Sequence, residues 1–238
     1  MENEFEISMN KNENLYSWIY RTLTEYFEYL TKDIFKDKLK GYDVTLVKTN
    51  TYLRYERDDR IDKVYSEPIK NIMHDKAKRI LECEKSIHTM DNLVHWYEED
   101  GLMKIKSFEI FIDEDGVNKF ILLHIDNMSD AMKLLKLIML HEIGHIIDNT
   151  DRNGISRDEY DRAKQENISL HNDHNERTIG CVDTRESWLE YFSIPYEKHA
   201  NEKVGINTYE LCDLYFKLRH ENKEYQTNLK IKSNTRYE

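Results

Sequence analysis

The chain has 238 residues, of which 34% are charged and 39% hydrophobic, and its formal net charge at neutral pH is −11. This length is sufficient to bury the core of one domain, with or without a smaller N-terminal piece, and the negative charge argues against nucleic acid or an anionic membrane as the main partner. The odd number of cysteines (Cys83, Cys181 and Cys212) and the absence of a CxxC pair argue against a disulfide framework and against a thiolate zinc site.

No targeting segment or membrane span is expected from the sequence. The N-terminus lacks a basic segment followed by an apolar run, so no Sec-type signal peptide is predicted. The longest apolar stretch, Leu134 to Leu140, is interrupted by Lys136 and is too short to cross a bilayer. We therefore expect a cytoplasmic protein, or one secreted or translocated by a route that needs no such signal.

Four elements are predicted in the first hundred residues. Apolar residues recur at helical spacing over 14–40, which predicts an amphipathic helix. The segment 42–59 is rich in β-branched and aromatic residues and predicts one or two short strands. A helix beginning at Pro68 is expected over 68–84, and a short helix over 90–99. The scarcity of breakers, with two prolines and seven glycines in the whole chain, favours a helix-rich fold.

A strand hairpin and a buried helix are predicted next. Two β-rich runs within 105–126 flank the pair Asp115-Gly116, which is typical of a tight turn between strands. Ser129 is a good N-cap for the following helix, whose sequence AMKLLKLIMLHEIGHIID is apolar on nearly every side. Such a helix is expected to run through the core, where polar side chains need partners.

Three further helices are expected toward the C-terminus. One covers 157–166, one covers DTRESWLEYFS with Asp183 or Thr184 as its N-cap, and an amphipathic helix covers 207–220. The polar tail that follows is expected to fray.

The central motif is His141-Glu142-Ile143-Gly144-His145, an HExxH. On a helix, residues i and i+4 lie on one face, so His141 and His145 can bind one metal ion, and Zn²⁺ is the expected cofactor. Glu142 lies beside that pair and is placed to take a proton from a zinc-bound water, whose pKa the ion lowers to about 7. The motif therefore predicts a metal-dependent hydrolase, with Glu142 as general base.

A catalytic zinc also needs a third protein ligand and an open fourth position. Glu186 and Glu190 lie one helical turn apart among aromatic residues, so one could bind the metal while the other holds a histidine ring by a hydrogen bond. His171 or His174 is an alternative ligand from a polar segment. Asp148, one turn beyond His145, could accept a hydrogen bond from the N–H of that ring or cap the helix end, and the sequence leaves both roles open.

The order HEIGHIID, about forty intervening residues, ESWLEYF and then KHANEKV resembles the catalytic domain of anthrax lethal factor and its relatives. In that family an HExGHxxD helix is followed by a glutamate-bearing helix of the form ExFAExF, and Pro-Pro endopeptidases have a similar layout. The resemblance covers roughly residues 120–220. It implies a zincin-like fold, in which a small sheet packs on the metal helix and its edge strand aligns the substrate.

The resemblance also implies roles for individual residues. Carried over by position, it makes His141 and His145 zinc ligands, Glu142 the general base and Glu186 the third ligand, with Glu190 supporting the site from outside it. The family usually has an oxyanion-stabilising tyrosine about seven residues before the ligand glutamate, and this position is Ile179 here. Candidates to replace that tyrosine are Tyr160, Tyr191 and His174.

Together these patterns predict an α+β, zincin-like fold that is helix-rich, with a small mixed sheet and a central HExxH helix. We divide the chain into a mainly helical N-terminal portion (1–104) that can belong to the same domain, a catalytic region (105–222) and a polar tail (223–238). The leading function is a zinc endopeptidase acting on a protein or peptide, including a toxin or effector protease. The alternatives are an intracellular HExGH peptidase that cleaves a repressor, and a zincin-fold protein-binding module with structural zinc.

Overall fold

The computed structural model describes residues 9–10, 13–49, 89–124, 127–178 and 184–218. Within these ranges the chain forms helices and one small mixed sheet, so the expected α+β class is confirmed. Several sequence predictions lie outside the described residues: the helix over 68–84, any strand after Thr49, the Asp183 cap, the region of Ile179 and the tail beyond 218.

The sheet is built around a long central strand, β3 (Leu102–Asp113). Strand β1 (Asp43–Thr49) pairs with it in parallel, and β2 (Met90–Glu99) pairs with it antiparallel on the other side. The two-residue strand β4 (Ile155–Ser156) pairs with the beginning of β3. Two of the strands come from the first hundred residues, so this part of the chain shares a sheet with the region that follows it.

The prediction of a helix over 90–99 is wrong, because this segment is β2. Its alternation is interrupted by a register shift between His95 and Trp96, which hides the period of two that marks a strand. The hairpin turn is Asp100-Gly101, and both residues have positive φ, 53° and 75°. Asp-Gly is well suited to such a turn, because the left-handed region is accessible to both residues.

The predicted hairpin over 105–126 is therefore also wrong in its second half. After β3 the chain forms α5 (Glu114–Leu123) in place of a returning strand. The carboxylate of Asp113 accepts the backbone N–H of Gly116 at 3.1 Å, which caps the first turn of this helix. The Asp115-Gly116 pair thus lies in the first turn of α5, where acidic side chains interact favourably with the positive end of the helix dipole.

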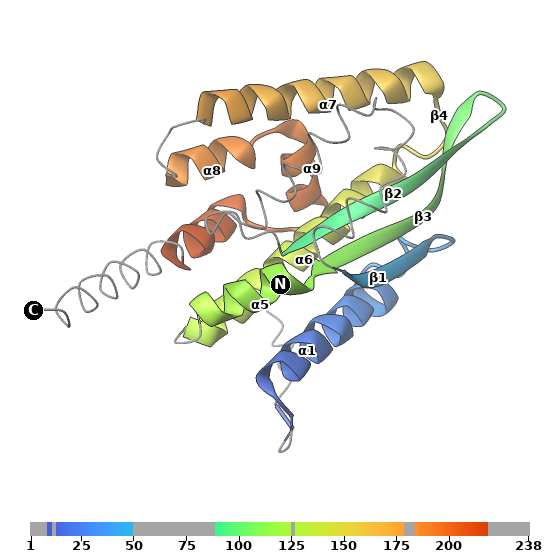
Figure 1. The fold of residues 1–238 in the computed structure, drawn as a ribbon. Helices are drawn as coiled ribbons and strands as arrows, with labels where there is room; N and C mark the ends of the chain where they lie inside the picture. The colour runs from blue at the N-terminus through green and yellow to red at the C-terminus, as the bar shows by residue number, and fades with distance from the viewer. Residues whose placement is uncertain (1–8, 11–12, 50–88, 125–126, 179–183, 219–238) are drawn as a thin grey trace, which may run out of the picture.

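The HExxH motif lies on α6 (Met128–Thr150), which runs between the sheet and α9 (Pro195–Val204) and also contacts α1 (Leu15–Tyr29) (Figure 1). The prediction of a helix buried on nearly every side is confirmed, although its N-cap is Asn127 and not Ser129. The fully buried core residues include Ile143 and Ile146 from α6 and Leu23 from α1. A short π-helical turn, η1 (Leu30–Ile34), extends α1 within the segment predicted as one helix.

Helices α7 (Arg157–Thr178) and α8 (Arg185–Tyr191) lie on the same side of α6 as α9 (Figure 1). Helix α7 is longer than expected, and the predicted cap of α8 is confirmed, because the Thr184 side chain accepts the backbone N–H of Ser187. Residues 208–218 are helical, as predicted. Helix α9, with Pro195 at its start and Gly205 as its left-handed C-cap, was not predicted as a separate element. None of the described helices has the length and apolar character required to cross a bilayer.

Candidate metal centre

The site is built where α6 and α9 come into close contact. At Gly144 there is no room for a side chain, because a Cβ atom would lie 2.1 Å from the backbone oxygen of Ala200. The glycine between the two histidines therefore lets the backbone of α9 lie directly against α6. This contact brings a side chain from the first turn of α9 to the histidine face of α6.

Three donor atoms converge at this contact. The Nε2 atoms of His141 and His145 are 3.0 Å apart, and Oε2 of Glu197 lies 3.0 Å from the first and 3.3 Å from the second. All three side chains are buried. The edge of a tetrahedron with zinc–ligand bonds of about 2.0–2.1 Å is about 3.3–3.4 Å, so these spacings are close to those of three ligands on one ion.

The hydrogen bonds around His141 favour a metal ion at this position. Its Nδ1 lies 2.8 Å from Oδ1 of Asn201, and the amide nitrogen of Asn201 donates to Thr208 Oγ1 at 3.4 Å. Nδ1 therefore donates, and in the neutral ring Nε2 carries a lone pair that faces the Glu197 carboxylate. Two acceptors held together in a buried site require a proton or a cation between them. The residues present thus fit a divalent metal ion.

The carboxylate of Glu142 lies beside this group and is bound from the sheet. Its Oε2 accepts a hydrogen bond from Nδ2 of Asn92, on β2, at 2.6 Å. Burial raises the pKa of Glu142 above its ordinary value, against the lowering effect of His141 and His145. The glutamate of the motif therefore points to the sheet side of the site and does not belong to the three-donor group.

Glu197 is the most heavily bonded carboxylate of the site. Its second oxygen, Oε1, lies 2.9 Å from Nε2 of His171 on α7. Burial by itself would raise the pKa of Glu197, but hydrogen bonds from His141, His145 and His171 lower it far below the ordinary value. The carboxylate is therefore ionised, as a metal ligand must be.

Aromatic rings enclose the histidines. Tyr196 stacks on His145, with ring centroids 4.2 Å apart, and Phe192 meets His141 edge to face at 5.6 Å. Tyr191 hydrogen-bonds to Glu197, and burial raises its pKa well above the ordinary value, so its hydroxyl is protonated. The three-donor group of His141, His145 and Glu197, called the metal group below, is thus bordered by aromatic rings on the α8–α9 side.

The predicted ligands divide into two groups. The structure brings His141 and His145 together and places Glu142 beside them, but it does not bring Glu186 to the site. Glu186 and Glu190 are both exposed on α8, and the third carboxylate is Glu197. The carboxylate that completes the three-donor group is therefore Glu197, on the next helix, in place of the predicted Glu186.

The supporting residues differ from expectation in the same way. On α9, the Glu197 carboxylate faces Nε2 of His141, and Asn201, one turn later, bonds the other ring nitrogen. Glu186 and Glu190 on α8 were predicted to have these positions. Asp148 is buried, and its carboxylate accepts a hydrogen bond from Arg152 at 2.8 Å.

The three candidate oxyanion partners lie in different surroundings. Tyr160 packs against Trp96 of β2, with ring centroids 5.1 Å apart and ring planes tilted by 58°. Tyr191 and His174 lie next to each other, with centroids 5.7 Å apart, and Tyr191 contacts the metal group through Glu197. Tyr191 lies close enough to Glu197 and Glu142 for their charges to raise the pKa of its hydroxyl.

Sequence reasoning missed three residues of the site: Glu197, Asn201 and Asn92. A signal was present for the first two, since Pro195 marks a helix start and a glutamate and an asparagine follow at i and i+4 spacing. His171 was predicted as an alternative ligand, and in the structure it hydrogen-bonds to Glu197 and does not belong to the three-donor group. No local pattern marks Asn92, whose position depends on the pairing of β2 with β3.

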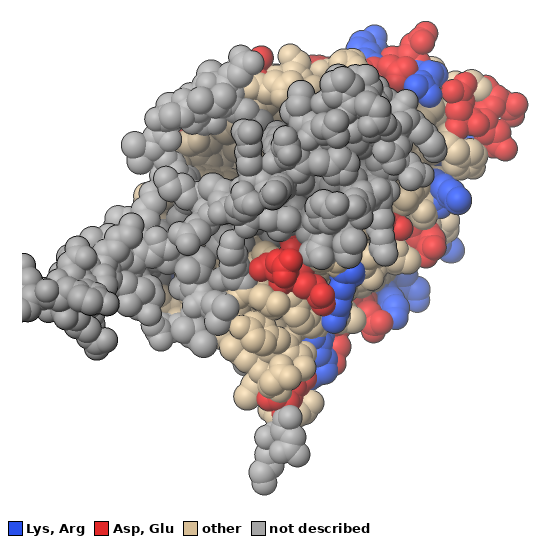
Figure 2. Space-filling model, in the orientation of Figure 1, with Lys and Arg blue, Asp and Glu red and all other residues tan. Residues whose placement is uncertain are grey.

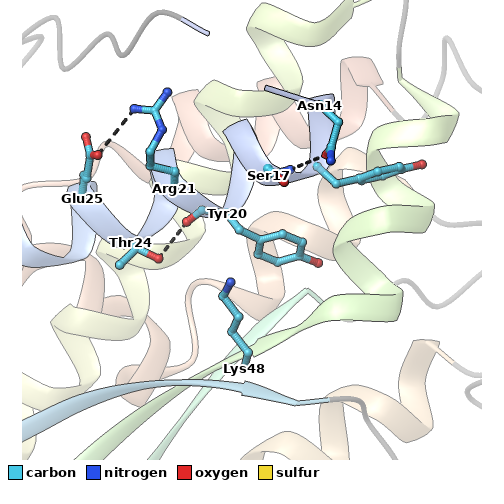
Figure 3. Close-up of a pocket in the computed structure, with 8 residues that line it drawn as sticks. Asn14, Ser17, Tyr20, Arg21, Thr24, Glu25 and Lys48 are labelled. Carbon is cyan, nitrogen blue, oxygen red and sulfur yellow. Dashed lines mark hydrogen bonds and ion pairs between the residues drawn. The ribbon is translucent and has the colours of Figure 1, made fainter. Parts of the chain in front are cut away.

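Two other features lie away from the metal group. A pocket of about 660 Å³ between α1 and β1 is lined by residues of both, with Lys48 placed over the ring of Tyr20 at 4.5 Å (Figure 3). Acidic side chains gather at the tip of the β2–β3 hairpin, where the sequence is Glu98-Glu99-Asp100 (Figure 2). Neither feature includes a residue of the three-donor group.

Comparisons with protein-family models, curated proteins and solved structures give no match to this chain. Function must therefore be argued from the chemistry of the site.

Proposed function

We propose that this protein is a zinc-dependent endopeptidase whose metal is held by His141, His145 and Glu197. The observation that carries the proposal is the position of Glu142, a buried carboxylate beside three converging donors that it does not join. A purely structural zinc site has no use for such a carboxylate and fills its fourth position with protein. Two imidazoles and one carboxylate are a common ligand set of catalytic zinc in peptidases.

When bound, zinc supplies a water of lowered pKa and a Lewis acid for the scissile carbonyl. Glu142 accepts the proton of the attacking water and returns it to the leaving amine. Asn92 donates a hydrogen bond to one of its oxygens and so fixes the carboxylate's orientation, leaving Oε1 for the proton. The raised pKa of Glu142 favours this double role, because a base must also hold the proton long enough to deliver it.

Tyr191 is the proposed donor to the oxyanion. Its hydroxyl is protonated and is already held at the metal group by Glu197. A neutral donor at this place can stabilise the negative charge that develops on the carbonyl oxygen. Tyr191 precedes Glu197 by six residues. If Glu197 is the third ligand, a tyrosine therefore lies close to the position, about seven residues before the ligand, at which the lethal factor family usually has one.

The resemblance to the lethal factor family matches Glu197 only in part. Counted from Glu197, two of the five fixed positions of the ExFAExF pattern match, at Glu197 and Ala200. Asn201 stands at the second glutamate, and His199 and Lys203 stand at the two Phe positions. Ala200 is the residue against which Gly144 of the HExGH motif packs.

Strand β2 is the proposed platform for an extended substrate. It pairs with β3 on one side only among the described strands, and its Asn92 reaches the general base. An extended peptide can add to such an edge through main-chain hydrogen bonds. A peptide bound there would run alongside β2 and pass the metal group.

The decisive variant is Glu142→Gln, which keeps the size and the hydrogen-bonding partner of the side chain but removes the base. We expect it to bind zinc with unchanged stoichiometry and to lose cleavage of a peptide library by at least about a hundredfold. The zinc content and the library are measured on the same preparation. Retained cleavage would refute the role of Glu142, whereas a wild-type protein that binds zinc without cleaving any peptide would favour a binding module.

A further inference from the structure

A third histidine lies just outside the metal group. His171, on α7, has its Nε2 atom 2.9 Å from Oε1 of Glu197, the carboxylate oxygen that does not face His141 and His145. Its other ring nitrogen, Nδ1, is 2.9 Å from the backbone carbonyl oxygen of Asn167, one turn earlier on the same helix. Both partners are acceptors, so the ring is oriented by a fixed point on α7 and donates to the carboxylate.

We propose that His171 is a positioning residue that keeps Glu197 as a one-oxygen metal ligand. The terminal torsion of a glutamate is soft, so a carboxylate without such a bond can rotate and offer both oxygens to an ion. With Oε1 held by His171, only Oε2 remains directed at the histidine nitrogens. The coordination position that a second oxygen would occupy is thus kept free for water or substrate.

The surroundings of α7 indicate that this bond is not a by-product of tight packing. Most of the described side chains of α7 are exposed or half-buried, and Ile168, on the turn before His171, is 41% exposed. Glu197, by contrast, is only 4% exposed. A polar side chain that extends from a solvated helix to a buried, ionised carboxylate is placed to control that carboxylate.

This inference requires the metal site but not peptidase activity, so it is tested by metal binding alone. Zinc affinity is measured by competition with a chromogenic chelator, and folding of each metal-free variant is checked by circular dichroism. His171→Ala removes the ring. His171→Asn keeps a donor for the Asn167 carbonyl but cannot reach Glu197, whereas His171→Gln places an amide nitrogen close to the position of Nε2. His199→Ala, at an exposed site on α9, is the matched control.

We expect zinc affinity to fall about 10- to 100-fold in the Ala and Asn variants, to stay within about threefold of wild type in the Gln variant, and to be unchanged in the His199 control. Rescue by Gln but not by Asn separates positioning of Glu197 from a local effect on α7. Equal zinc affinity in wild type, His171→Ala and His171→Asn would overturn the proposal, and so would a Gln variant as weak as Ala. A wild-type protein that binds no zinc would overturn it together with the metal site.

Discussion

The contact between α6 and α9 makes a sharp prediction for Gly144→Ala. The added Cβ would lie 2.1 Å from the Ala200 carbonyl oxygen, whereas ordinary contact begins at 3.4 Å, so the two backbones must separate by 3.4 − 2.1 = 1.3 Å. The atom in the way is backbone, so no side-chain rotation relieves the clash. Metal ligands tolerate displacements of only about 0.2 Å, so a shift of this size also removes Glu197 from the histidines.

Two free-energy terms of opposite sign decide the stability of this variant. In a helix interior, alanine is more favourable than glycine by about 1 kcal/mol. Overpacking a close contact costs about 1–3 kcal/mol. Because this contact is between two backbones and cannot relax, we expect a cost in the upper part of that range, about 2–3 kcal/mol. After the gain from alanine, the metal-free protein should be destabilised by about 1–2 kcal/mol. The expected loss of zinc affinity is at least about tenfold.

Urea unfolding of the metal-free protein measures the first effect, and chelator competition measures the second. Gly205→Ala is the matched control, because Gly205 has a φ of 72° and no atom within 4 Å of the position of an added Cβ. That variant should lose about 1 kcal/mol through backbone strain alone and keep its zinc affinity. If Gly144→Ala proved as stable as wild type, with unchanged zinc affinity, the close approach of α6 and α9 would be wrong.

Three further outcomes follow from the site. Glu197→Gln should lower zinc affinity by at least about a hundredfold, whereas Glu186→Gln should leave it unchanged in the same competition assay; the reverse order would restore Glu186 as the ligand. Asn201→Ala should weaken zinc binding about 10- to 100-fold, because His141 loses the acceptor that fixes its tautomer, and Asn201→Asp, which keeps an acceptor, should recover most of it. Zinc affinity measured by calorimetry should fall as the pH is lowered, because protons compete for the ligands. Burial lowers the pKa of His141, but its contacts with Glu197 raise it above the ordinary value overall, so the fall should begin above about pH 6.5, and a pH-independent affinity would contradict this.

The helix that carries the HExxH motif could be predicted from the sequence because each of its signals is local. The spacing of His141 and His145 requires only that the segment be helical, and the apolar residues around them ensure that it is. The same is true of the Thr184 cap, which depends on residues three positions apart. Such features do not depend on what the rest of the chain does.

The third donor of the group could not be predicted in this way because its position depends on how two helices pack. Glu186 and Glu190 have the right mutual spacing and aromatic neighbours, but Glu197 and Asn201 have the same spacing on the following helix. The choice is made by Ala200, whose backbone lies against Gly144 and so selects α9 as the partner of α6. A glycine in the motif and an alanine between the two spaced residues were the available signals.

The strand errors have a different cause. The sequence predicts a helix over 90–99 and a hairpin over 105–126 because the Asp115-Gly116 pair is typical of a tight turn, but the turn is formed by the other Asp-Gly pair, at 100–101. Both pairs favour a turn, and only long-range pairing of β2 with β3 separates them. The position of Asn92 beside Glu142 depends on that pairing, so the sequence does not predict it.

The most direct test of the account is a crystal structure of the zinc-loaded protein with anomalous diffraction data collected at the zinc absorption edge. We expect one anomalous peak within about 2.0–2.2 Å of Nε2 of His141, Nε2 of His145 and Oε2 of Glu197, with the second oxygen of Glu197 turned to His171. A peak bonded to other side chains, or no peak at these atoms in protein that contains zinc, would contradict the metal centre and the function proposed from it.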